Sequence, residues 1–272
     1  MSAFLFILRF VCLSGIGFLG LTSMAYAQSS DNSDLAKQLA NPVANLISVP
    51  LQLNYDSGYG SEDGDKTFIN VQPVIPISLN EDWNLISRTI LPLVHQNDIN
   101  GNSGTDTGLG DTVQSFFISP VEPTSGGLIW GVGPALLLPT ATDDALGKDQ
   151  WGAGPTAVGL FSHGGWTYGA LANHIWSGDN GSVASETNAT FFQPFLNYTT
   201  PDAWSFILNT ETTYDWEADQ WSIPVNGLVT KLMSIGDQKI SVGGGVRYWA
   251  ESPDAGPDGW GIRLQLTFLF PK

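Results

Sequence analysis

The 272-residue chain ends in "WGIRLQLTFLFPK", residues 260–272, where large apolar residues alternate with smaller or polar ones. The large apolar residues are Trp260, Ile262, Leu264, Leu266, Phe268 and Phe270. A period of two predicts a β-strand with two unlike faces. One face is apolar along its whole length, and the other carries Arg263. Such a strand needs an apolar environment on one side and a polar environment on the other.

Similar runs, separated by turn residues, recur from Leu46 onward, and none of them has a convincing helical period. They predict twelve strands, at 46–56, 67–79, 83–95, 111–119, 127–139, 151–162, 166–177, 187–198, 203–215, 221–233, 239–250 and 260–270. The runs at 83–95 and 187–199 change phase or carry a proline, which predicts β-bulges there.

The connections between the predicted strands alternate in length. The longer ones are "SGYGSEDGDK", "QNDINGNSGTDTGLG", "ATDDALGKDQ", "SGDNGSVASE", "WEADQ" and "ESPDAGPDG". The shorter ones are "NED", "VEPTSGG", "HGG", "TTPDA" and "SIGDQ". Long outer loops, short periplasmic turns and an even strand number are typical of an outer-membrane barrel. The predicted fold is therefore all-β, an up-and-down antiparallel transmembrane β-barrel.

Composition favours this barrel over a soluble β-sandwich or a closed soluble barrel. Charged residues make up 13% of the chain, against about 25% in soluble globular proteins. The polar strand faces carry Ser, Thr, Asn, Gln and Gly, where a soluble protein would carry Lys and Glu. Tryptophans also gather at strand ends, as in the aromatic girdles of membrane barrels. These are Trp83, Trp151, Trp166, Trp176, Trp204, Trp221, Trp249 and Trp260.

Three segments are predicted along the chain. Residues 1–27 have the apolar run and the "AYA" site of a signal peptide, with an uncleaved membrane anchor as the alternative. Residues 28–45 form a periplasmic leader, with a short helix capped by Ser33 and stopped by Pro42. Residues 46–272 form the barrel. The leader is too short for a plug domain of an energy-coupled importer, although it could occlude the lumen from below.

Charge and cysteine content limit the partners. The single cysteine, Cys12, lies in the signal segment, so the mature chain has no disulfide or zinc–thiolate site. A net charge of −16 argues against nucleic acid. No cofactor is expected. We expect a monomer in the bacterial outer membrane, in contact with the lipid bilayer and lipopolysaccharide. We expect the barrel-assembly machinery to recognise the last strand through Phe268 and Phe270.

Most of residues 46–272 also resembles a known family. The stretches that carry the resemblance are "TGLGDTVQSFFISP" (107–120), "IWGVGPALLLPTATDDALG" (129–147), "WGAGPTAVGLF" (151–161), "WTYGALANHIWS" (166–177), "QPFLNYTT" (193–200), "NTETTYDWEADQWSIPVN" (209–226) and "GGGVRYWAESPDAGPDGWGIRLQLTFLFPK" (243–272). They are similar to bacterial outer-membrane proteins linked to the meta-pathway of phenol degradation, some of them labelled transporters. The resemblance implies an outer-membrane barrel and a hydrophobic or aromatic solute. It implies no catalytic residues.

Charged residues inside the strands are the candidate lumen residues, because a charge facing lipid costs about 2–4 kcal/mol at the membrane midplane. The candidates are Arg88, Glu211, Arg247, Arg263 and, at the rim, Glu251. If Ala250 lies opposite Trp260, Arg247 pairs with Arg263, and Glu211 or Glu251 must compensate the two like charges. Two interpretations remain open: a basic patch that favours anionic solutes, and an internal salt-bridge cluster. Lys231 is expected to snorkel to the periplasmic interface.

Metal and catalytic sites have weaker support. The acidic residues of the outer loops could bind Ca²⁺, although they lack the EF-hand pattern. These weak candidates are Asp143, Asp144, Asp215, Glu217 and Asp219. A hydrolase would need a base such as His174, with Asn173 and Ser177 nearby, but no G-x-S-x-G motif is present. We therefore do not expect an enzyme.

The predicted function is passive or facilitated passage of small molecules across the outer membrane, with hydrophobic or aromatic solutes implied by the resemblance. The alternative is a non-conducting structural or adhesive barrel with a salt-bridged lumen, and a hydrolase is the third hypothesis.

Overall fold

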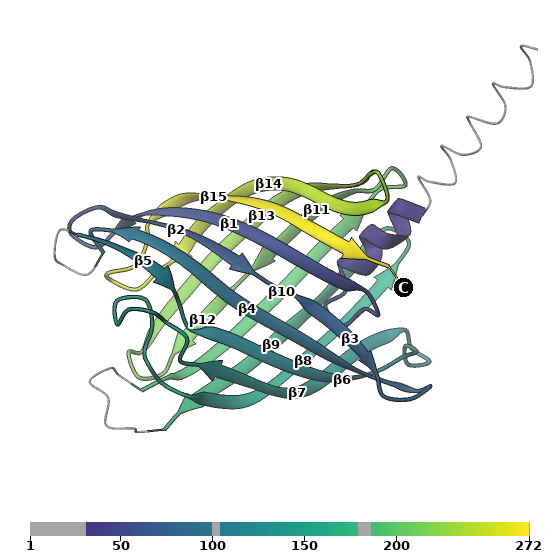
Figure 1. Cartoon of the computed structure of the whole chain (residues 1–272), viewed down its shortest axis with the longest axis horizontal. Coiled ribbons are helices and arrows are strands. Elements are labelled where there is room, and N and C mark those ends of the chain that lie inside the picture. Colours follow the sequence, from purple (N-terminus) through teal and green to yellow (C-terminus); the bar gives the residue numbers. More distant parts are fainter. Residues whose placement is uncertain (1–30, 100–103, 179–185, 272) are drawn as a thin grey trace, which may run out of the picture.

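The computed structural model describes residues 31–99, 104–178 and 186–271. The strand segments in these residues form one antiparallel sheet that curves into a barrel (Figure 1). Their bounds are β1 (Ile47–Tyr59), β2 (Gly64–Val71), β3 (Val74–Ser78), β4 (Trp83–Asn97), β5 (Thr105–Leu109), β6 (Thr112–Pro120), β7 (Leu128–Leu138), β8 (Gly152–His163), β9 (Trp166–Ser177), β10 (Asn188–Thr199), β11 (Trp204–Thr210), β12 (Thr212–Asp215), β13 (Gln220–Ile235), β14 (Gln238–Glu251) and β15 (Gly259–Phe270).

Six of these fifteen described segments are halves of three interrupted strands. β2 and β3 both pair with β1 and β4, β5 and β6 both pair with β4, and β11 and β12 both pair with β10 and β13. The fifteen segments therefore make twelve strands. The last strand, β15, pairs with the first, β1, and β9 pairs with β10. The sheet closes on itself, which satisfies backbone hydrogen bonds in lipid. The predicted twelve-stranded membrane barrel is confirmed.

The two faces of the wall differ as the alternation predicts. In β15 the side chains of Ile262 and Leu264 are 55% and 51% exposed on the outer face, whereas Arg263 between them is 1% exposed in the lumen. Aromatic pairs occur near the strand ends on the outer face, for example Tyr248 with Trp260, at 4.9 Å between ring centroids. The exposed apolar face is the one that meets lipid.

The irregularities that were expected at the prolines of β4 and β10 occur instead in the strands that pair with them. β4 and β10 each run as one strand, without the predicted bulges. Extending the registers places Pro92 opposite Gly110 and Pro194 opposite Thr210. The interruptions follow at these partner positions, between β5 and β6 and between β11 and β12. A proline has no N–H to donate to the ladder, so the neighbouring strand loses its regular pairing there.

The first outer connection is shorter than predicted. β1 continues to Tyr59 and β2 begins at Gly64, so that the strands extend through most of "SGYGSEDGDK". Gly60 and Asp63 have positive φ angles of 59° and 53° in the intervening turn. The observed register shift lies between Ser57 and Tyr59 of the same hairpin.

The described part of the leader, residues 31–45, enters the barrel at the end that carries the short turns, here called the turn end. Its residues 31–39 form a helix beside the C-terminal end of β15 (Figure 1). The helix ends before Pro42, as predicted. Ser33 is not its N-cap: Ser33 lies inside the helix and donates a hydrogen bond to the carbonyl of Thr200, at 3.1 Å. The predicted signal peptide lies outside the described residues.

Apolar and polar contacts both hold the leader in place. Leu35 and Ala36 pack with the luminal side chains of Leu232 and Leu269 in one buried cluster. Lys239 near the turn end forms a 2.9 Å ion pair with Asp31. No helix in the described part of the chain is long and apolar enough to span a membrane.

Candidate functional site

The lumen contains a network of charged side chains, the luminal charge cluster. It consists of Asp56 on β1, Glu211 between β11 and β12, Arg247 on β14 and Arg263 on β15, joined by Asn54 on β1. Alternation turns the strand residues inward, and barrel closure brings β1 next to β15. Asn54 and Arg263, 209 positions apart in the sequence, thereby meet.

Arg263 and Glu211 form the strongest pair of the cluster. The Nη1 and Nη2 atoms of Arg263 donate to the two carboxylate oxygens of Glu211, at 2.8 and 2.7 Å. Its Nε donates to Asn54 Oδ1, at 2.6 Å. This bidentate geometry gives strong, directional charge-assisted hydrogen bonds. Because β13 and β14 lie between β12 and β15, the pair braces the inner wall across two intervening strands.

Arg247 links the same acid to a second one. Its Nη1 lies 3.6 Å from Asp56 Oδ2, and its Nη2 lies 3.9 Å from Glu211 Oε2. The guanidinium also stacks on the ring of Trp249, at 4.7 Å, and Trp249 donates to Asp56 Oδ1, at 3.1 Å. The predicted place of Trp249 in the outer aromatic girdle is therefore wrong, because strand alternation puts it on the luminal face with Arg247. The four charges are therefore two cations and two anions in mutual contact, as the salt-bridge interpretation expects.

The predicted pairing of Arg247 with Arg263 is wrong by two residues. Arg247 lies opposite Gly261, and Arg263 lies opposite Gly245. The hairpin pairs Trp249 with Gly259, so Ala250 does not lie opposite Trp260. A slip of two residues keeps each side chain on the same face, and both arginines still point inward. Gly261 leaves room at this point, because a Cβ there would lie 2.4 Å from Asp56 Oδ1.

The structure brings Glu211 into the cluster and leaves Glu251 outside it. Glu251 is exposed at the end of β14, opposite Ile223 and beyond a register shift in β13. No cation of the described residues lies within ion-pair distance of it. The second acid of the cluster is Asp56, which was not among the predicted lumen residues. The alternation of its strand could have identified it, because Asp56 shares the polar face of that strand with Asn54.

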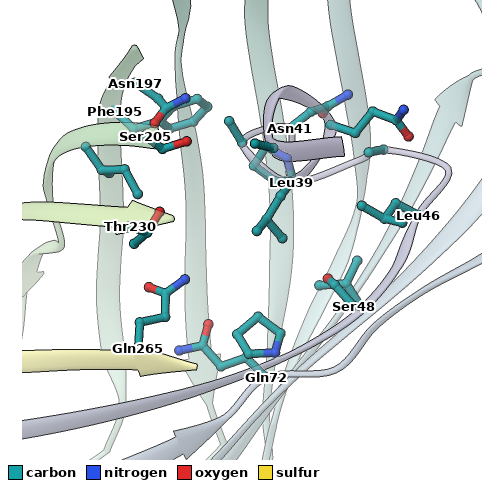
Figure 2. A pocket seen from close by; sticks show the side chains of 18 of the residues that line it. Leu39, Asn41, Leu46, Ser48, Gln72, Phe195, Asn197, Ser205, Thr230 and Gln265 are labelled. Atoms are coloured by element: carbon teal, nitrogen blue, oxygen red, sulfur yellow. The ribbon is translucent and has the colours of Figure 1, made fainter. Parts of the chain in front are cut away.

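Arg88 on β4 points into a cavity between the leader and the barrel wall. The cavity has a volume of about 200 Å³ and contacts the leader at Leu39 and Asn41, among others. Across the cavity, Figure 2 shows the polar side chains of Thr230 and Gln265. We call it the leader cavity. The leader cavity adjoins the luminal charge cluster. Asn209, which lines the cavity, is two residues before Glu211, and Gln265, which also lines it, is two residues after Arg263 on the same strand face.

One side of the lumen is apolar. Five buried side chains on the inner faces of β4, β6, β8 and β9 pack together with one leader residue, and we call this set the apolar luminal wall. Its members are Val43, Ile86, Phe117, Val158, Leu160 and Leu171. Phe195 of β10, which also lines the leader cavity, packs against this wall. A water-filled porin lumen is polar throughout, so this surface is suited to apolar groups.

Two lysines outside the set of lumen candidates lie near the ends of the barrel. Lys231 donates to the carbonyl of Asp202 and sits 5.1 Å from the ring centroid of Trp204, in agreement with its predicted place at the interface. Lys66 on β2, which sequence reasoning placed in a loop, lies opposite Asp56 in the strand ladder.

The acidic loop residues take part in local hydrogen bonds. Asp215 accepts from the backbone N–H groups of residues 217 and 218, Tyr214 donates to Asp219, and Asn188 donates to Glu217. Asp143 accepts from the backbone of residue 145, and Asp144 is exposed. Within the described ranges, no three His, Cys, Asp or Glu side chains form a group that could hold a metal ion.

His174 belongs to the outer girdle. Its Nδ1 lies 2.7 Å from Thr190 Oγ1, and its ring centroid lies 4.0 Å from that of Trp176, whose side chain is exposed. Ser177 donates to Gln150 Oε1 at 2.6 Å, and strand alternation turns it to the opposite face. His174 and Ser177 therefore do not form a nucleophile–base pair in this structure.

Solved structures that resemble this barrel include channels and a phospholipase. The COG4313 outer membrane channel from Pseudomonas putida F1 has a TM-score of 0.65 and 15% identity, over 83% of this chain and 96% of that one. The NanC porin has a TM-score of 0.50 and 12% identity, over 81% and 98%. The outer membrane phospholipase A from Escherichia coli has a TM-score of 0.44 and 9% identity, over 82% and 96%. The first two likenesses show the outer-membrane barrel fold, and at such low identity they show nothing finer.

Sequence comparison gives the family. A search of curated proteins found no match. The model of a family described as "Putative MetA-pathway of phenol degradation" matches residues 61–272. That range covers more than three quarters of the chain and agrees with the resemblance seen in the sequence. The chain is a bacterial outer-membrane β-barrel that belongs to this family.

Proposed function

We propose that this barrel is a passive channel for small hydrophobic or aromatic molecules. The observation that carries the proposal is the apolar luminal wall, in which Ile86, Phe117 and Leu160 are fully buried on the inner side of the barrel. Apolar surface in the lumen favours a solute that leaves water. A passage for ions or sugars would need polar groups in its place.

The leader narrows this passage in the conformation described. Val43 packs on the apolar luminal wall, and Leu39 projects into the leader cavity (Figure 2). A solute as large as an aromatic ring would need the leader to shift. Among the described residues, the leader is held by two small apolar clusters and a few polar bonds at the turn end, and its displacement would leave the strand ladders of the wall intact.

The alternative is a structural barrel that conducts nothing. It is favoured by the luminal charge cluster, whose two cations and two anions are mutually paired. Such a cluster stiffens the inner wall whether or not a solute passes. The two proposals differ in one measurable respect, because only the channel speeds the uptake of a solute.

Uptake of labelled toluene and of labelled arabinose by Gram-negative host cells tests the channel. Cells that make the protein should take up toluene several-fold faster than cells without it, and arabinose equally fast. Phe117→Asn places an amide in the apolar luminal wall and should lower toluene uptake, whereas Phe117→Leu should keep it. Each variant is first checked for folding by its heat-modifiable migration on a gel. Equal toluene uptake with and without the protein would support the structural barrel instead.

A further inference from the structure

Arg88 differs from the other two luminal arginines. Arg247 and Arg263 both contact Glu211. Arg88 has no hydrogen bond to another side chain or to a backbone carbonyl, and no carboxylate within 4.0 Å, among the described residues. Glu211 attracts it only from a greater distance. Arg247 and Arg263 are paired with carboxylates of the luminal charge cluster, whereas Arg88 places a cation without a contacting carboxylate next to the leader cavity.

The position of Arg88 is fixed by the sheet. It pairs with Val74 of β3 on one side and with Ser115 of β6 on the other. It is partly exposed to the lumen, and it lines the leader cavity together with Gln72 and Gln193. Its guanidinium is therefore accessible from the cavity while its backbone is held by two strand ladders.

The leader cavity has the size and lining for one small amphiphilic molecule. Its volume is about 200 Å³, and an apolar cavity of about 150 Å³ is enough to bind benzene. Leu39, Val74 and Phe195 supply apolar surface, and Asn209 and Gln265 supply polar groups. A ring or short alkyl chain can lie against these apolar side chains while a charged group of the same molecule faces Arg88.

We propose that Arg88 binds the carboxylate of a small aromatic or aliphatic monocarboxylic acid in the leader cavity. A guanidinium matches a carboxylate through two parallel hydrogen bonds. A neutral solute that filled the cavity would leave this cation desolvated and unpaired, which is unfavourable. Of the described residues that line the cavity, Arg88 alone is a cation. The second charge of a dicarboxylate would therefore lie near Glu211 without a cation to pair with. This site rests on the proposed channel function, because the acid would reach the leader cavity through the channel.

Binding of labelled benzoate to the refolded full-length protein in detergent tests this site. Benzoate is ionised at pH 7, and benzamide is its neutral counterpart. Wild type should bind benzoate more tightly than benzamide. Arg88→Gln should weaken benzoate binding tenfold or more, which is about 1.4 kcal/mol or more, and should not weaken benzamide binding, since a neutral ligand no longer leaves a cation unpaired. Arg88→Lys should retain part of the affinity. Lys66→Gln, which removes a luminal cation outside this cavity, should bind benzoate like wild type.

Two results would overturn the site: equal benzoate affinity in wild type and Arg88→Gln, or benzamide binding as tight as benzoate binding in wild type. Arg88→Lys keeps the test decisive if Arg88→Gln fails to fold. Toluene uptake separates this inference from the channel, because toluene has no carboxylate. Faster toluene uptake without benzoate binding refutes the carboxylate site alone. Benzoate binding without faster toluene uptake supports the site and refutes the channel.

Discussion

At the scale of single residues, the luminal charge cluster joins side chains from the first and the last strands of the barrel. Strand alternation turns Arg247, Arg263 and Glu211 into the lumen. The pairing depends on barrel closure, which brings Asp56 and Asn54 of the first strand beside the last. Arg88 is unpaired for the same reason, because the position of the other strands decides which acids lie within reach.

Glu211→Gln should destabilise the barrel strongly. It removes the anion that contacts both Arg263 and Arg247, and breaking a buried pair by removing one partner costs about 3–5 kcal/mol. Urea unfolding of the refolded protein in detergent measures the change in the free energy of unfolding. Glu251→Gln is the matched control, because Glu251 is exposed and outside the cluster. Its effect should stay within about 0.5 kcal/mol.

If Glu211→Gln changed the free energy of unfolding as little as Glu251→Gln does, the cluster would have no structural role. Adding Arg263→Met to Glu211→Gln should restore part of the stability, since the double variant leaves fewer unpaired charges in the lumen. A double variant less stable than the single one would contradict this account of the pair.

Gly261→Ala tests the packing behind the cluster. The new Cβ would lie 2.4 Å from Asp56 Oδ1 and 2.6 Å from the carbonyl oxygen of Tyr55, so the backbone must move. Overpacking of this kind costs about 1–3 kcal/mol, and the same urea unfolding measures it. Gly227→Ala is the control, because a Cβ at Gly227 meets no atom within 4 Å. Equal effects of the two substitutions would show that Gly261 is not required for its size.

At the scale of elements, strand positions could be predicted closely and irregularities could not. The prolines in β4 and β10 marked irregular places correctly, but the breaks lie in the strands opposite. A sequence pattern identifies the residue without a donor, whereas the strand that adjusts is decided by pairing. The leader helix was likewise predictable from its stop at Pro42. Its docking inside the barrel was not, because the cluster of Leu35 with Leu232 and Leu269 is formed by distant segments.

At the scale of the whole molecule, up-and-down connectivity allows the fold and the strand number to be predicted from the sequence. Each strand pairs with its neighbours in the chain, so counting alternating runs gives the strand number without knowledge of distant contacts. Among the strand pairings of the described residues, only the β1–β15 pairing that closes the barrel is remote in sequence. The content of the lumen is the least predictable feature, because it depends on which side chains the closed wall brings together and on where the leader lies.

Single-channel conductance of a variant with an undocked leader tests most directly whether the lumen is a passage. Leu35→Asp buries a carboxylate among Leu232 and Leu269, which is unfavourable without a partner, so the leader should leave the lumen. Asp34→Asn changes the charge of the same helix by one unit at an exposed side chain outside the lining of the leader cavity and serves as the control. We predict several-fold larger conductance for Leu35→Asp than for wild type, with Asp34→Asn at the wild-type level. A folded, heat-modifiable Leu35→Asp barrel that conducts no more than wild type would contradict the proposed channel.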